Sequence, residues 1–198
     1  MNALIVIDPQ IDFCPGGALA VQGGDSIMPE INQRLDKFET AIVTQDWHPS
    51  GHSSFASSYP GQSAFGVVEM PYGDQVLWPD HCIAGTKGAE FHPELLINKV
   101  DAIIRKGSNP QIDSYSAFFE NDRRTPTGLA GLLRERGCKA LTMVGLATDF
   151  CVAWSAIDGA NLGFAVEVDL EACRAIDLDG SLDKALSDMR AAGVTILS

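Results

Sequence analysis

Residues 140–161 read ALTMVGLATDFCVAWSAIDGAN, an apolar run that passes directly into a helical pattern. The run Ala140–Val144 has the length and composition of a buried strand. Thr148–Asn161 follows it as a predicted helix, with Gly145 permitting a tight turn and Thr148 as a natural N-cap. Such a direct step from strand to helix is the unit from which parallel α/β sheets are built.

The same alternation recurs along the whole chain. Predicted helices cover Ser26–Phe38, with Asp25 or Ser26 as its cap, Thr127–Arg136, with Gly137 in the stop position, and Ser181–Ala192. Further strand-length apolar runs are Ala3–Ile7, Ala41–Thr44, Ala102–Ile104, Phe164–Val168 and Val194–Leu197. The sequence therefore predicts an α/β fold: a doubly wound, mainly parallel six-stranded sheet with helices on both faces.

Composition limits the function classes. With 198 residues and 45% apolar content, the chain suits a single domain over residues 1–198. The net charge of −12 disfavours nucleic acid and anionic membrane surfaces as partners. No apolar run approaches the ~20 residues of a membrane span, and the N-terminal run meets Asp8 without a basic region before it. We therefore expect a cytoplasmic protein; the sequence leaves a homo-oligomer open.

One region interrupts the alternation. Ten of the fifteen residues from Pro49 to Ser63 are Gly, Pro or Ser. The loop-rich insertion at about 47–93 contains all four histidines and two of the three tryptophans. Long loops in compact domains are usually functional or disordered, and the clustered His and Trp favour a functional one. In open α/β sheets ligands bind beyond the carboxyl ends of the strands, so polar residues there are the first candidates.

Three such residues form one candidate group. Asp8 ends the first strand and suits a general base, although Asp-Pro also opens turns. Lys106 follows the run Ala102–Ile104, where a solvated surface lysine is the plain alternative. Cys151 falls in the first predicted helical turn, where backbone N–H groups and the helix dipole favour a thiolate. Its alternative is a buried core cysteine, the state expected of most of the five cysteines, which form no CxxC pair.

A second group contains carboxylate and imidazole ligands. Asp46 and His48 are two residues apart, so on an extended chain both side chains leave from one face. His81 comes later in the insertion, and His52 is a fourth candidate ligand that stays open. These ligands suit one divalent metal ion, and zinc, iron and manganese fit equally well.

Taken together, these motifs resemble the nicotinamidases, within the isochorismatase-like cysteine hydrolases. The matching pieces run nearly end to end: VIDPQIDFCPGGALAV (6–21), TQDWHP (44–49), WPDHCIAGTKGAEFHP (78–93), IRKG (104–107), DSYSAF (113–118) and VGLATDFCV (144–152). The resemblance implies a catalytic triad of Asp8, Lys106 and Cys151. It also implies metal ligation by Asp46, His48 and His81.

The resemblance further implies how the substrate is held. The family's pocket for nicotinamide matches Phe13 and Trp78, which stack on the ring, with Tyr115 and Leu146 nearby. Its oxyanion hole is built by the N–H groups of Ala147 and Cys151, beside a cis peptide bond at Leu146–Ala147. The implied activity is the metal-dependent hydrolysis of nicotinamide to nicotinate and ammonia through a thioester, with pyrazinamide as a related substrate.

Two alternatives stay open at this point. The first is another amidohydrolase of the superfamily, acting on a ureido or carbamoyl substrate; the metal ligands argue against it. The second is a non-catalytic metal-binding α/β module in which Cys151 is merely buried. Related isochorismatases lack the nucleophilic cysteine, so Cys151 argues against that activity. Whether Cys14 or Cys82 makes the protein sensitive to oxidation also stays open.

Overall fold

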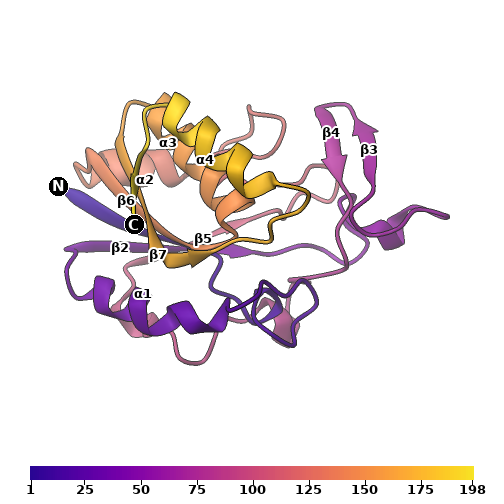
Figure 1. Ribbon diagram of the computed structural model, residues 1–198, viewed down its shortest axis with the longest axis horizontal. Coiled ribbons are helices and arrows are strands. Elements are labelled where there is room, and N and C mark those ends of the chain that lie inside the picture. The colour runs from indigo at the N-terminus through magenta and orange to yellow at the C-terminus, as the bar shows by residue number, and fades with distance from the viewer.

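The structure, a computed structural model, describes residues 1–198 and is built around one parallel sheet (Figure 1). The sheet order is β5-β2-β1-β6-β7-β8, and every neighbouring pair is parallel. The strands are β1 (Asn2–Ile7), β2 (Thr40–Asp46), β5 (Ala102–Lys106), β6 (Ala140–Leu146), β7 (Ala165–Arg174) and β8 (Thr195–Leu197). All six predicted strands are confirmed. Figure 1 shows α1 on one face and α2, α3 and α4 on the other, as predicted.

The four helices are shorter than the sequence pattern suggested. They span α1 (Met28–Leu35), α2 (Leu129–Glu135), α3 (Ala153–Asn161) and α4 (Ser181–Ala191). Short 3₁₀ turns take up some of the difference, such as Asp25–Ile27 before α1. The predicted caps are wrong: no side chain caps this turn, and the Ser26 hydroxyl instead donates to the Gly23 carbonyl. Gly137 does follow α2 with a left-handed φ of 71°.

The link between β6 and α3 differs from the prediction in form. Thr148–Val152 makes a π-helical turn that leads straight into α3, and Ala147 rather than Thr148 precedes it, without a side-chain cap. The peptide bond Leu146–Ala147 is cis, as the resemblance implied. Gly145 serves close packing rather than a tight turn: a Cβ there would lie 2.1 Å from the Ile7 carbonyl oxygen. β6 can therefore lie against the end of β1 only with glycine at this position.

The core lies between the sheet and its helices. Residues 3–7 of β1 and 41–43 of β2 are almost completely buried, which explains their continuous apolar runs. β1 sits between β2 and β6, so the chain turns to opposite sides of the sheet from this strand. That reversal places the carboxyl ends of β1, β2 and β6 side by side, where ligand sites of such sheets form.

The insertion between β2 and β5 contains a hairpin that the sequence did not predict. β3 (Val67–Met70) and β4 (Gly73–Val76) pair antiparallel and project from the body of the molecule (Figure 1). Most of their side chains are exposed or half-buried, so no apolar alternation marks them. None of the helices in the molecule combines the length and apolar character needed to cross a bilayer.

Candidate active site and metal centre

Four strands bring the predicted triad residues and Asp46 together at the carboxyl end of the sheet. Asp8 follows β1, Asp46 ends β2, Lys106 ends β5, and Cys151 lies in the turn after β6. Asp46 and Lys106 are direct neighbours in the β2–β5 register. Residues up to 143 positions apart in sequence thus meet because parallel strands end together.

The Asp8 carboxylate is held in place by its neighbour on β2. The Asp8 backbone N–H donates to Thr44 Oγ1 at 3.1 Å, and the Thr44 hydroxyl donates to Asp8 Oδ1 at 2.6 Å. Asp8 itself has a left-handed φ of 46°, which turns the chain sharply at the end of the strand. Its other oxygen, Oδ2, lies 2.9 Å from the Lys106 ammonium.

Lys106 joins the two predicted groups. Its side chain is fully buried, and its Nζ contacts Asp8, forms an ion pair with Asp46 Oδ1 and donates to the Ser114 carbonyl at 2.8 Å. The same ammonium lies 3.4 Å from Cys151 Sγ. One cation is therefore shared by the nucleophile candidate, the base candidate and a metal-ligand candidate. The plain alternative of a solvated lysine is excluded.

Burial and these charges shift the pKa values of the group. Burial raises the pKa of Asp8 to about 6, against the opposing effect of Lys106. Burial also acts to raise the pKa of Asp46, but Lys106 and His48 outweigh it and hold that pKa well below its usual range. For Lys106, burial acts downward, yet the two carboxylates hold its pKa well above its usual value. The lysine is thus charged at neutral pH, and Asp46 is ionised.

The Cys151 thiol differs from the sequence expectation of a stabilised thiolate. Burial raises its pKa well above the usual value, and the nearby Lys106 offsets this only in part. The reason is that the residue is 7% exposed, so the cost of desolvating a thiolate exceeds the benefit of a single cation. Attack by so deeply buried a thiol is helped by a base that takes its proton. An Asp8 carboxylate oxygen lies within 4.8 Å of the sulfur.

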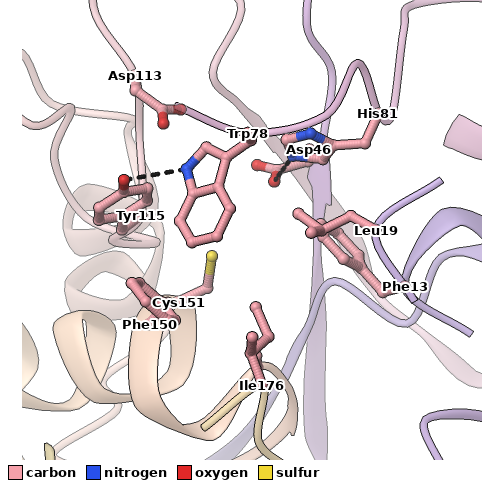
Figure 2. A pocket seen from close by; sticks show the side chains of 11 residues that line it. Phe13, Leu19, Asp46, Trp78, His81, Asp113, Tyr115, Phe150, Cys151 and Ile176 are labelled. Carbon is pink, nitrogen blue, oxygen red and sulfur yellow. Dashed lines mark hydrogen bonds and ion pairs between the residues drawn. The ribbon is translucent and has the colours of Figure 1, made fainter. Parts of the chain in front are cut away.

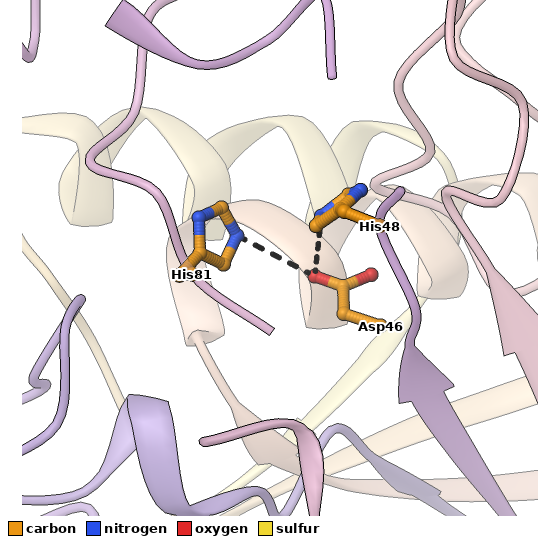
Figure 3. A group of neighbouring side chains, drawn as sticks. All are labelled: Asp46, His48 and His81. Carbon is orange, nitrogen blue, oxygen red and sulfur yellow. Dashed lines mark ion pairs between the residues drawn. The ribbon is translucent and has the colours of Figure 1, made fainter. Parts of the chain in front are cut away.

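Asp46, His48 and His81 form a buried cluster in which both imidazoles face one carboxylate oxygen (Figure 3). His48 Nε2 lies 3.6 Å and His81 Nε2 3.9 Å from Asp46 Oδ2. The Nδ1 of His48 lies 2.9 Å from the Gly107 carbonyl, and that of His81 2.8 Å from the Pro79 carbonyl. A carbonyl accepts and cannot donate, so each Nδ1 carries a proton, and the Nε2 of each ring is the atom that a metal ion would bind. This donor set fits a divalent metal ion.

Backbone features fix this cluster. Gly107, with a left-handed φ of 66°, is required because a Cβ there would lie 2.4 Å from the His48 ring. The buried Gln10 amide clamps the main chain of Asp46: it donates to the Asp46 carbonyl at 2.8 Å and accepts from the Asp46 N–H at 2.7 Å. Burial lowers the pKa of His81 to about 4, so that ring is neutral. Sequence reasoning gave Gln10 no role.

The two remaining histidines are not part of the Asp46/His48/His81 cluster, although His52 forms a second buried group with His48 and Asp113. The His52 ring packs 4.5 Å from that of His48, measured between centroids, but both of its nitrogens have protein partners. Its Nε2 contacts the Asn109 carbonyl and its Nδ1 the Ser54 hydroxyl, each at 2.8 Å. His92 is half-buried, and its Nδ1 accepts from the Glu94 N–H.

A narrow pocket opens beside these groups (Figure 2). The Cys151 thiol points into the space between Trp78, Phe13 and Ile176. Asp46 and His81 line the same pocket, and so does Ala147. The predicted pocket residues Phe13, Trp78 and Tyr115 all line it, whereas Leu146 is fully buried and is not among the lining residues.

Four lining residues were not predicted: Leu19, Asp113, Phe150 and Ile176. Leu19, Asp113 and Phe150 lie within the sequence motifs that carry the family resemblance, so those motifs could have indicated them. Ile176 had none, because it comes from the loop after β7. That loop is tied to the nucleophile turn by Asp149, whose carboxylate accepts from the backbone N–H groups of Ile176 and Asp177 at 3.0 and 2.8 Å.

Comparison with known proteins identifies the family of the chain. The family model described as an isochorismatase domain matches residues 2–198. The chain belongs to the isochorismatase family. A nicotinamidase of this family from Acinetobacter baylyi is 54% identical over 196 residues, which cover 99% of this chain and 92% of that protein.

Solved structures extend the comparison. The nicotinamidase and pyrazinamidase of Acinetobacter baumanii superposes with a TM-score of 0.98 at 52% identity, covering all of this chain and 95% of that one. The pyrazinamidase of Pyrococcus horikoshii, solved in complex with zinc, has a TM-score of 0.80 at 35% identity over 100% and 98% of the two chains. These structures share the whole α/β fold with this chain.

Proposed function

We propose that the protein is a nicotinamidase, an amidohydrolase that converts nicotinamide to nicotinate and ammonia. The observation that carries this proposal is one pocket with three properties. The thiol of Cys151 points into it, the candidate metal ligands Asp46 and His81 line it, and aromatic rings enclose it. The nicotinamidases to which the chain is similar support the choice of substrate.

The pocket suits a small flat heteroaromatic amide. Most of its lining residues are hydrophobic, as is usual for small-molecule sites. Phe13 and Trp78 form apolar walls for the ring, and Tyr115 closes the side near Trp78. Such a site also admits pyrazinamide, whose ring has the same size and shape.

Asp46, His48 and His81 are the residues that would hold a divalent metal ion. When bound there, the ion supplies a Lewis acid with an open position that a pyridine nitrogen can fill. Zinc, iron(II) and manganese(II) all match an Asp/His/His set. His52 stays outside this set, because both its ring nitrogens have protein partners.

In the first half of the reaction, Asp8 takes the proton of the Cys151 thiol as the sulfur attacks the carboxamide carbon. Lys106 stabilises the negative charge that develops on the sulfur and holds the base in place. The N–H groups of Ala147 and Cys151 receive the oxyanion. Asp8 then returns its proton to the amide nitrogen, the C–N bond breaks, and ammonia leaves a thioester on Cys151.

In the second half, water attacks the thioester carbon while Asp8 accepts a proton from that water. The C–S bond breaks, the thiolate recovers the proton from Asp8, and the product leaves as nicotinate after its carboxyl group loses the second proton of the water to solvent. A base with a pKa of about 6 suits both halves, because it is ionised at neutral pH yet accepts and returns a proton readily. The raised pKa of the buried Cys151 thiol makes such a base useful.

Ammonia release from nicotinamide by the purified protein, before and after chelation of metal, tests this proposal. We expect release that chelation abolishes and that Cys151→Ala lacks. Release from a ureido or carbamoyl compound but not from nicotinamide would favour the other amidohydrolase reading. No release from any amide by a folded, metal-loaded protein would favour a non-catalytic metal-binding module.

A further inference from the structure

The hairpin β3–β4 sends one side chain into the body of the protein. Its other residues are exposed or half-buried, but Gln75 on β4 is fully buried. Glutamine is rarely buried completely unless its amide is hydrogen-bonded. Gln75 is not among the residues that line the pocket, so its partners must explain its position.

The Gln75 amide is saturated on both sides. The two hydrogens of Nε2 are shared among three acceptors: the Val76 carbonyl at 2.8 Å, Asp113 Oδ2 at 3.0 Å and Tyr115 Oη at 2.8 Å. Oε1 accepts from Asn121 Nδ2 and from the Tyr72 hydroxyl, each at 3.2 Å. The partners fix the orientation of the amide, because a carbonyl and a carboxylate can only accept. The network thus connects the hairpin to residues about 40 positions away.

Two of these partners lie in the pocket wall. Asp113 and Tyr115 both line it, and both are buried. Tyr115 Oη accepts a second hydrogen bond, from the indole Nε1 of Trp78 at 3.0 Å (Figure 2). The phenol oxygen therefore faces two donors, Gln75 Nε2 and Trp78 Nε1. A continuous chain leads from the hairpin through Tyr115 to the indole that forms one wall of the pocket.

We propose that Gln75 is a positioning residue that holds Tyr115, Asp113 and, through the Tyr115 hydroxyl, the Trp78 indole in the geometry that binds the aromatic ring of the substrate. This inference rests on the proposed function for the identity of that ring. Trp78 packs edge-on against Tyr115 and Phe150, with centroids 6.1 and 4.9 Å away. Those contacts confine the ring but leave its N–H end to be held by the hydrogen bond. Gln75 thereby gives the hairpin a role in substrate affinity without touching the substrate.

Steady-state kinetics of Gln75→Met on nicotinamide are the first test. Methionine keeps the length and removes both polar ends of the side chain. We expect KM to rise about tenfold, the loss of roughly one hydrogen bond's worth of binding, while kcat changes less than about twofold. Gln62→Met is the matched control, since Gln62 is exposed in the same insertion and has no such partners; its KM should stay unchanged.

The second test is independent of turnover. In protein labelled with ¹⁵N-tryptophan, Trp47, Trp78 and Trp154 give three indole N–H signals. The signal that disappears in Trp78→Phe is that of Trp78. We expect Gln75→Met to move the Trp78 signal and to leave the other two in place. Gln75→Asn, which retracts the amide by one methylene group, should move it in the same way and serves if the methionine variant fails to fold.

A double-mutant cycle with Tyr115→Phe separates positioning from general stability. If Gln75 acts through the Tyr115 hydroxyl, the double variant should have no higher KM than the more affected single variant. Additive effects, an unmoved Trp78 signal, or an unchanged KM would each overturn the inference. If the unmodified protein releases no ammonia from nicotinamide, the proposed function fails instead, and the Trp78 signal alone decides the role of Gln75.

Discussion

Lys106 is the residue whose removal we expect to cost the most stability. Its ammonium is fully buried between two carboxylates, 2.9 Å from Asp8 Oδ2 and paired with Asp46 Oδ1, and it also donates to the Ser114 carbonyl. Lys106→Met has nearly the same length and fills the same space. The substitution therefore removes the charge and its hydrogen bonds with little change in packing.

The magnitude follows from the uncompensated carboxylates. Breaking a buried ion pair by removing one partner typically costs about 3–5 kcal/mol, because the other charge is left without compensation. The penalty should depend on pH. Lys106 now restrains the rise of the Asp8 pKa, so its loss moves that pKa further above about 6. A carboxyl group whose pKa is raised in the folded state contributes stability below its unfolded pKa, and this is lost as pH rises through the folded value. The penalty should therefore be large at pH 8 and smaller at pH 5.

Urea unfolding of the metal-free protein at both pH values measures this penalty, since chelation removes any contribution of the ion. Lys99→Met is the matched control, because Lys99 forms a single partly exposed pair with Asp36. We expect the control to lose no more than about 1 kcal/mol. A loss for Lys106→Met as small as that of the control, or equal at pH 5 and pH 8, would refute the reasoning.

Three further outcomes are expected. Cys151→Ala should abolish ammonia release while circular dichroism and metal content stay unchanged; residual turnover would reject Cys151 as nucleophile. Activity should fall as pH drops through about 6, where Asp8 becomes protonated, and a flat profile from pH 8 to 5 would argue against Asp8 as the base. His81→Ala should lose stoichiometric metal by elemental analysis, whereas His92→Ala should retain it; equal metal content in the two variants would remove His81 from the ligand set.

The centre of the sheet could be predicted because β1, β2 and β6 are buried on both faces. Burial of this kind demands continuous apolar runs, and those runs are visible in the sequence without knowledge of their neighbours. The residues at the strand ends could be found for the same reason: Asp8 and Lys106 stand where an apolar run stops. The alternation of strands and helices indicates parallel strands. Parallel strands end on the same side of the sheet, so Asp8 and Lys106 are expected to lie close together.

The hairpin and the Gln75 network could not be predicted in this way. The hairpin's side chains are mostly solvated, so they carry no apolar period, and Gln75 alone reads as a surface residue. Its burial depends on Asp113, Tyr115 and Asn121, which lie 38–46 positions later. The pKa of Cys151 was missed for a related reason. Sequence position identifies a helix start, but the desolvation that dominates the pKa depends on residues from the whole pocket.

The position of Lys106 gives a physical reason for the thiol and the metal cluster to share one site. A buried thiol beside Asp8 and Asp46 would meet two negative charges, and both raise its pKa. The shared ammonium offsets part of this charge, and a divalent ion held by Asp46 would offset more. Metal removal should then impair the chemical step as well as the binding of the ring. In single-turnover experiments at saturating nicotinamide, this reasoning predicts slower thioester formation without metal; an unchanged rate would confine the metal to substrate binding.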